Sequence, residues 1–296
     1  MREHRCSILA LASIACIVSI LCATSLALGQ SALDGEKSAK ILSQFAGKWV
    51  VSSVAVFIGP GEIPHVIVDD PTLMGRYEDI SPTKIKKFDF ADNVCNQPYA
   101  TVKETTGKGL IGEMMSGDDA KRLFDNFSPP IPIDNDQVIS EYSFTCAGYD
   151  PVTHKTFSYG GDDIVPLPDG RLMDIYGTPN IVVFLNRADP NAKATPSFDC
   201  AKAHTSPEVA ICKSIELSSY DRAIANTYKE TKAGLENTIK SNSVSAGTDK
   251  EQLAALRKLQ QEEIQKRNKC GDDPQCLLEA LRHDAKALVE FVRQSM

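Results

Sequence analysis

The sequence predicts an α+β protein with two domains: an antiparallel β sandwich or small barrel, followed by a disulfide-stapled three-helix domain. Its 296 residues are more than one ordinary domain of roughly 100–200 residues needs. From residue 49 to residue 185, short β-branched and aromatic runs alternate with turn residues, which is typical of antiparallel β structure. After residue 196 the apolar residues recur at helical spacing between four cysteines, and this pattern predicts the helical domain.

The segment 1–29 has the pattern of a secretory signal peptide. Arg2 and Arg5 precede an apolar run over residues 8–23, and a small-x-small exit signal follows it, so we expect cleavage before Gln30. The apolar run approaches the roughly 17–25 residues that a membrane-spanning helix needs. Small and polar residues dilute it, however, and a processing site follows it. We therefore expect no stable membrane span after processing.

The expected mature chain is acidic and periplasmic or secreted. Removing the leader lowers the net charge from −7 to −8, because the leader carries a net charge of +1. Nucleic acids and anionic membrane surfaces require an excess of Lys and Arg, so neither is an expected partner. A lipoprotein processed at Cys16 or Cys22 is the less favoured alternative, since Cys16 lies deep in the apolar run and large aliphatic residues precede Cys22.

Six cysteines remain after the leader, and we expect three disulfides, because exported proteins fold under oxidising conditions. The pairing favoured by neighbourhood in the sequence is Cys95 with Cys146, Cys200 with Cys212, and Cys270 with Cys276. A zinc site is not expected, since the chain contains no Cys-x-x-Cys and no histidine pair at ligand spacing near these cysteines.

The β-rich domain is expected to span residues 31–188. A short amphipathic helix over 36–46 precedes a strand over 49–57, in which Trp49 is a core residue. Further strands are expected at 75–80, 85–90, 99–103, 138–146, 157–159, 172–176 and 181–185, with one helix at 116–127. Cys95 and Cys146 fall at strand edges, where a disulfide could join two strands.

A polar, proline-bearing linker at 189–196 leads to the helical domain at 197–296. The first helix is expected to begin at Thr205-Ser206-Pro207-Glu208, where a capping box coincides with proline in the first turn. A second capping box, Thr248 with Glu251, predicts the start of the second helix, and Asp273-Pro274 predicts the start of the third. The cysteines lie where helices begin or end, so their disulfides would fix the corners between helices.

Residues spread over the helical domain form a specific pattern together with its cysteines. They are Phe198, Asp199, Glu208, Asp221, Tyr228, Gln260 and Arg267. This pattern resembles the domain at the N-terminus of LprI-type lysozyme inhibitors, a family of small exported bacterial helical domains. One position departs from the family, because Glu263 stands where the family usually carries a tryptophan, seven positions before its third cysteine.

No catalytic, cofactor or metal site is expected, and we predict that the protein is not an enzyme. The chain has no Gly-x-Ser-x-Gly, no His-Glu-x-x-His and no phosphate-binding glycine loop. Its histidines are scattered singly. Paired aspartates such as Asp69-Asp70 and Asp272-Asp273 precede prolines, so turn and cap roles explain them better than calcium binding.

The resemblance implies that this protein is an exported bacterial binding protein that inhibits lysozyme by protein-protein contact. An acidic surface could dock on a cationic lysozyme, and such binding would weaken with salt. The alternative is a small-ligand-binding β-barrel protein of the cell envelope with an accessory helical domain. That alternative draws on the opening Gly47-Lys48-Trp49 and the short strands after it, which are similar to lipocalin-like small barrels.

Overall fold

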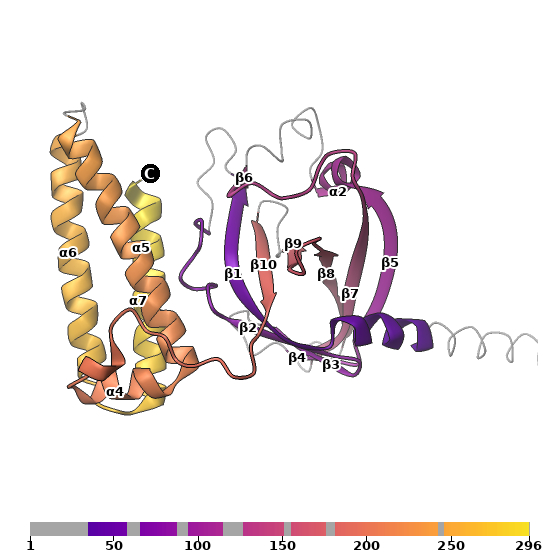
Figure 1. Cartoon of the computed structure of the whole chain (residues 1–296), viewed down its shortest axis with the longest axis horizontal. Coiled ribbons are helices and arrows are strands. Elements are labelled where there is room, and N and C mark those ends of the chain that lie inside the picture. Colours follow the sequence, from indigo (N-terminus) through magenta and orange to yellow (C-terminus); the bar gives the residue numbers. More distant parts are fainter. Residues whose placement is uncertain are drawn as a thin grey trace, which may run out of the picture.

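The computed structural model describes residues 35–57, 66–87, 94–114, 127–150, 155–175, 181–241 and 246–295. It has the predicted α+β fold: a curled antiparallel sheet is followed along the chain by a set of packed helices (Figure 1). The sheet takes up residues 47–187 and the helices residues 200–295. Between them the chain runs through an irregular stretch that includes the expected linker.

The sheet contains ten strands within the described residues. They are β1 (Gly47–Phe57), β2 (Tyr77–Ser81), β3 (Lys84–Lys86), β4 (Val94–Asn96), β5 (Tyr99–Thr106), β6 (Phe127–Ser128), β7 (Val138–Asp150), β8 (Lys155–Pro166), β9 (Leu172–Ile175) and β10 (Ile181–Arg187). Their order is β4-β3-β2-β1-β10-β9-β8-β7-β5, with β6 paired to β1. Each predicted strand has a counterpart in this sheet. The helix predicted at 116–127 lies outside the described residues except for Phe127, which opens β6.

The strands at the two ends of the sheet, β4 and β5, follow each other in the chain. The two ends of the sheet therefore lie close together, and the sheet curls into a half-barrel. β4 pairs with β3, and β5, which begins three residues after β4 ends, pairs with β7. Gln97 in the connection has a left-handed φ of 57°, which turns the chain from one partner strand to the other. Cys95 on β4 is disulfide-bonded. Cys146 lies on the adjacent strand β7, and its pairing with Cys95 stays a prediction because its side chain lies outside the described residues.

Both faces of the central strands are buried. On one face, Val54 of β1 lies opposite Val183 of β10 and packs in the same core as Leu42 and Phe45 of the helix at 35–45. Trp49 is buried in this core, as predicted, and its Nε1 donates a hydrogen bond to the Phe45 carbonyl at 2.8 Å. On the opposite face, a second core includes β-strand residues and the segment around Ile131 and Ile133.

In the part of the chain that the structure describes, the helical region contains one 3-10 turn and four helices. They are η2 (Cys200–Lys202), α4 (Ser206–Lys213), α5 (Ile215–Lys240), α6 (Ala246–Asn268) and α7 (Pro274–Ser295). The three long helices α5, α6 and α7 pack pairwise into a bundle (Figure 1). Its core is built mainly of leucines on one face of each helix, and Leu256, Leu277 and Leu281 are almost completely buried.

Local capping residues explain where most of these helices begin. Thr205 and Glu208 form the predicted capping box of α4, and Asp273 caps α7 by accepting hydrogen bonds from two backbone N–H groups. The predicted first helix is divided at Ser214, whose N–H closes α4 and whose hydroxyl caps α5. The predicted second capping box is wrong as a helix start, because α6 already begins at Ala246 and places Thr248 inside the helix.

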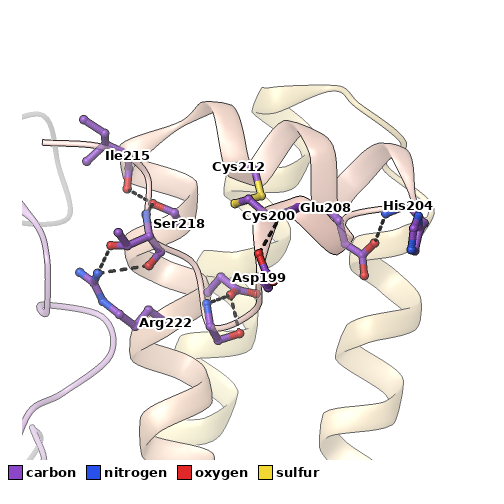
Figure 2. Close-up of a disulfide and its surroundings, with 12 residues drawn as sticks. Asp199, Cys200, His204, Glu208, Cys212, Ile215, Ser218 and Arg222 are labelled. Atoms are coloured by element: carbon purple, nitrogen blue, oxygen red, sulfur yellow. Dashed lines mark hydrogen bonds between the residues drawn. A yellow bond between two sulfur atoms is a disulfide. The ribbon is translucent and has the colours of Figure 1, made fainter.

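Two of the predicted disulfides close the corners of the helical part. Cys200 of η2 is bonded to Cys212 of α4, with 5.8 Å between the Cα atoms (Figure 2). Cys270, just after α6, is bonded to Cys276 in the first turn of α7, with 5.5 Å between the Cα atoms. The bonds therefore hold the entrance of the bundle against its first helix and fix the turn from α6 to α7.

Replacing both Cys200 and Cys212 by serine should lower the free energy of unfolding of the bundle by about 3 kcal/mol. The bond spans 12 residues, and the entropy that closing such a loop removes from the unfolded chain corresponds to about that value. Urea unfolding followed by circular dichroism would measure the loss. Reduction of the wild-type protein should lower its midpoint at least as far, and an unchanged midpoint in the double variant would contradict the prediction.

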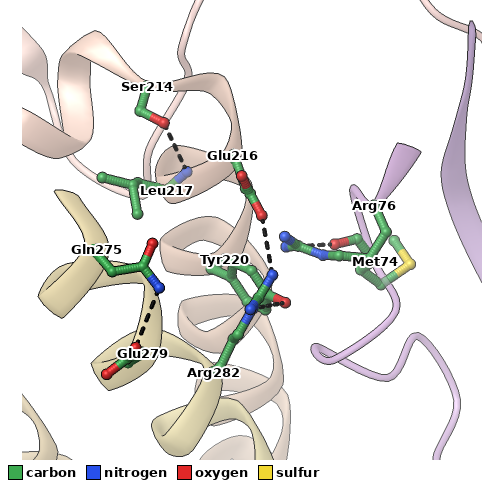
Figure 3. Close-up of polar contacts among 9 residues, drawn as sticks. All are labelled: Met74, Arg76, Ser214, Glu216, Leu217, Tyr220, Gln275, Glu279 and Arg282. Atoms are coloured by element: carbon green, nitrogen blue, oxygen red, sulfur yellow. Dashed lines mark hydrogen bonds and ion pairs between the residues drawn. The ribbon is translucent and has the colours of Figure 1, made fainter. Parts of the chain in front are cut away.

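The turn before β2 contacts the bundle directly. Gly75 has a φ of +73°, and a Cβ built there would lie 2.7 Å from the Cβ of Ser219 on α5, so only glycine permits this approach. The guanidinium carbon of Arg76 lies 3.1 Å from the ring centroid of Tyr220 (Figure 3). Burial of this guanidinium between sheet and bundle lowers the pKa of Arg76 to about 10.

Candidate functional site

A pocket of about 260 Å³ opens among α5, α6, α7 and the segment that leads into η2. Its polar lining consists of Ser197, Asp221, Tyr228, Gln260, Arg267 and Asp284. The rest of the lining is the ring of Phe198 and aliphatic side chains of the three long helices. The pocket therefore combines charged groups with an apolar and aromatic surround, which is the usual character of a binding site.

Helical periodicity explains why these residues share one pocket. Asp221, Ile224 and Tyr228 follow one another at spacings of three and four on α5, so they lie on the same helix face. Gln260 and Arg267 are seven residues apart on α6, which again corresponds to one face. The packing of α5 against α6 and α7 brings these faces together.

Five of the seven residues that carry the LprI resemblance line this pocket: Phe198, Asp221, Tyr228, Gln260 and Arg267. The other two hold local structure instead. Asp199 caps η2 by accepting a hydrogen bond from the N–H of Ala201 at 3.0 Å. The Glu208 carboxylate accepts hydrogen bonds from the backbone N–H groups of Thr205 and His204, and these bonds lower its pKa (Figure 2).

Asp221 and Arg267 form an ion pair that organises one side of the pocket. The Asp221 side chain is 6% exposed, and its Oδ1 lies 3.1 Å from Nη1 of Arg267. Its Oδ2 accepts hydrogen bonds from the N–H and the hydroxyl of Ser197, at 2.7 and 2.6 Å. One carboxylate thus connects α5 to α6 and to the segment before η2.

Glu263, the departure from the resembling family, is buried and paired. It is 3% exposed, and its two oxygens contact Lys266 Nζ at 2.6 Å and His283 Nδ1 at 3.0 Å. His283 of α7, which the sequence shows only as an isolated histidine, thereby contacts a residue of α6. The charge of Glu263 is thus compensated at the position where the family usually carries a tryptophan.

Asp284 is the pocket residue that sequence reasoning missed. It is 7% exposed, and no described residue donates a hydrogen bond to its carboxylate. Burial raises the pKa of Asp284 to about 7, with further contributions from the carboxylates of Glu263 and Asp221. A usable signal was present in the sequence: Asp284 stands on the apolar stripe of α7, between the core positions Leu281 and Leu288.

The pocket presents a carboxylate and hydrogen-bonding groups, and these groups suit the binding of a polar or charged ligand. Among the described residues, no group of three or more His, Cys, Asp or Glu side chains is placed to hold a metal ion. All four cysteines of the helical part are engaged in disulfides.

The helices in the described part of the chain include none that is both long and apolar enough to cross a membrane.

Neither a protein-family model, nor a curated protein, nor a solved structure matches this chain. The resemblance to LprI-type domains therefore stays a prediction that rests on the residues themselves.

Proposed function

We propose that the protein is an exported bacterial binding protein that acts by protein-protein contact, with a cationic lysozyme as its partner. The observation that carries the proposal is the convergence of Phe198, Asp221, Tyr228, Gln260 and Arg267 on one pocket. These residues come from three separate parts of the chain, and they are among the residues that carry the resemblance to lysozyme inhibitors.

Charge and compartment support the same proposal. The chain has a net charge of −7, which favours encounter with a cationic protein and disfavours nucleic acid. The disulfides Cys200–Cys212 and Cys270–Cys276 fit an extracellular or periplasmic protein, since such bonds persist in oxidising compartments. Lysozymes act on the cell wall, which an exported protein can reach.

The test is lysozyme digestion of a peptidoglycan suspension in the presence of the chain from Gln30 onward. We expect slower digestion at micromolar protein and low salt, with the effect fading as salt screens the charges. Tyr228→Ala in the pocket should weaken inhibition. Tyr99→Ala, a matched change at an exposed position of the sheet, should not. Digestion at the same rate with and without the protein would overturn the proposal.

A second candidate function is suggested by one residue of the sheet. Asp174 on β9 is 1% exposed, and one of its carboxylate oxygens has no hydrogen-bond partner among the described residues. Burial raises its pKa to about 6. A small ligand held by the curled sheet would hydrogen-bond this oxygen. Native mass spectrometry of freshly purified protein should then show a discrete mass increment that Asp174→Asn reduces, whereas the bare polypeptide mass would contradict this candidate.

A further inference from the structure

Asp284 is the one carboxylate at the pocket that forms neither a hydrogen bond nor an ion pair within the described residues. Asp221 is paired with Arg267, and the nearby Glu263 is paired with Lys266. Asp284 makes no hydrogen bond or ion pair to any described residue, although it is almost fully buried and lines the pocket. A buried carboxylate normally has a partner, because desolvating the charge is costly. A group that enters the pocket can supply this partner, because Asp284 lines it.

We propose that the pocket receives the cationic end of a lysine or arginine side chain from a partner protein, with the Asp284 carboxylate as its acceptor. This inference rests on the proposed function, because a partner protein supplies the side chain. It adds the chemistry of the contact: a charge-assisted hydrogen bond, which is among the strong polar contacts in proteins.

The size and lining of the pocket fit such a side chain. Its volume of about 260 Å³ is below the roughly 300–1,000 Å³ of pockets for drug-sized ligands, and it suits one long side chain. Phe198, Ile224 and Leu281 offer apolar surface to an aliphatic stem. The rings of Phe198 and Tyr228 can also attract a cation through their faces.

An anion would fit this pocket poorly. The charge of the Arg267 guanidinium is already balanced by Asp221 through Nη1, so an incoming anion would compete with that carboxylate even if it bound the Arg267 Nε, which has no hydrogen-bond partner among the described residues. It would also lie close to Asp284 and to the other carboxylates that raise the Asp284 pKa. With Asp284 ionised, the pocket side chains carry a net charge of −1, which a monovalent cation neutralises.

Binding of a cation should depend on pH. Burial and nearby carboxylates raise the pKa of Asp284 to about 7, so the carboxylate is largely protonated at pH 6 and largely ionised at pH 8. The affinity for a cation should therefore rise roughly tenfold between these pH values. The other titratable or charged groups around Asp284 are Asp221 and Tyr228 on α5, Glu263, Lys266 and Arg267 on α6, and His283 on α7.

The test uses small probes, so that it does not depend on lysozyme. We expect butylammonium and butylguanidinium, added at constant ionic strength and pH 8, to shift the amide NMR signals of pocket residues such as Gln260 and Tyr228. The neutral isostere 1-butanol should bind at least about tenfold more weakly, because it forms no charge-assisted bond. Butylammonium binding without butylguanidinium binding would assign the pocket to lysine, and the reverse to arginine.

Two variants locate the effect. Asp284→Asn should weaken binding of the cationic probes by about 10- to 100-fold, the value of one hydrogen bond to a charged group. Asp272→Asn makes the same charge change at an exposed site outside the pocket and should leave binding unchanged. In His283→Gln the pH dependence of cation binding should persist, because it arises from the titration of Asp284 and not of His283.

The outcomes separate this inference from the proposed function. Equal binding of butylammonium and butanol, or equal loss in Asp284→Asn and Asp272→Asn, would overturn the cation pocket even if the protein inhibits lysozyme. Selective binding of the cationic probes by a protein that does not affect lysozyme would support the pocket and refute lysozyme as the partner.

Discussion

Asp221→Ala is expected to lower the free energy of unfolding of the helical bundle by about 3–5 kcal/mol, the usual cost of removing one partner of a buried ion pair. Without the carboxylate, the partly buried Arg267 loses its ion-pair partner, and the N–H and hydroxyl of Ser197 lose their acceptor. Urea unfolding at pH 7, followed by circular dichroism of the helices, would measure this loss.

Asp199→Ala provides a matched control, because Asp199 also accepts a backbone hydrogen bond but is exposed. Its loss should cost only about 1 kcal/mol, the value of a capping residue. In the double variant Asp221→Ala with Arg267→Met, the loss should be smaller than the sum of the single losses, since no charge is left unpaired. Additive losses would show that the two residues do not act as a pair.

Features of the fold that depend on neighbouring residues could be predicted from the sequence. The starts of α4 and α7 were predicted because the capping residues Thr205 and Asp273 accept hydrogen bonds from backbone N–H groups only two or three residues further along the chain. The division at Ser214 was missed, since the apolar face continues across it and only the hydroxyl contact reveals the break. The helix α2 (Gly107–Met114) was missed because its three glycines disfavour helix.

Long-range pairings could not be predicted in this way. β1 lies beside β10, with Trp49 opposite Arg187, and no local pattern distinguishes this neighbour from other strands of similar composition. The residues of the pocket could be predicted only in part from the sequence. The spacing of Asp221 and Tyr228 places them on one face of α5, but the level at which α6 and α7 meet that face depends on the packing of the whole bundle. Asp284 was therefore not associated with them.

Asp284→Asn is expected to stabilise the protein at pH 8, by about 2–4 kcal/mol. The pKa of Asp284 is about 7 in the folded protein, against roughly 3.9 for an unfolded aspartate. Between about pH 4 and pH 7 the folded state therefore keeps a proton that the unfolded state releases. The wild type should lose stability as the pH rises through this window, and above pH 7 it bears the full cost of the buried charge.

The measurement is the urea midpoint of both proteins at several pH values from 4 to 8. The difference between them should be smallest at pH 4, where Asp284 is protonated in the folded state, and should grow up to pH 8. Asp272→Asn, which changes the same charge at an exposed position, should run parallel to the wild type. A constant difference across the pH range would show that the Asn variant acts through packing and not through the charge of Asp284.

A stabilising effect of Asp284→Asn would also bear on function. A residue that costs stability where a neutral isostere would not is expected mainly at sites that serve binding or catalysis. If the pocket receives a lysine or arginine side chain, butylammonium should raise the urea midpoint of the wild type at pH 8, because it binds the folded state and neutralises the carboxylate. The same addition should leave Asp284→Asn unchanged, since that variant has no charge to neutralise.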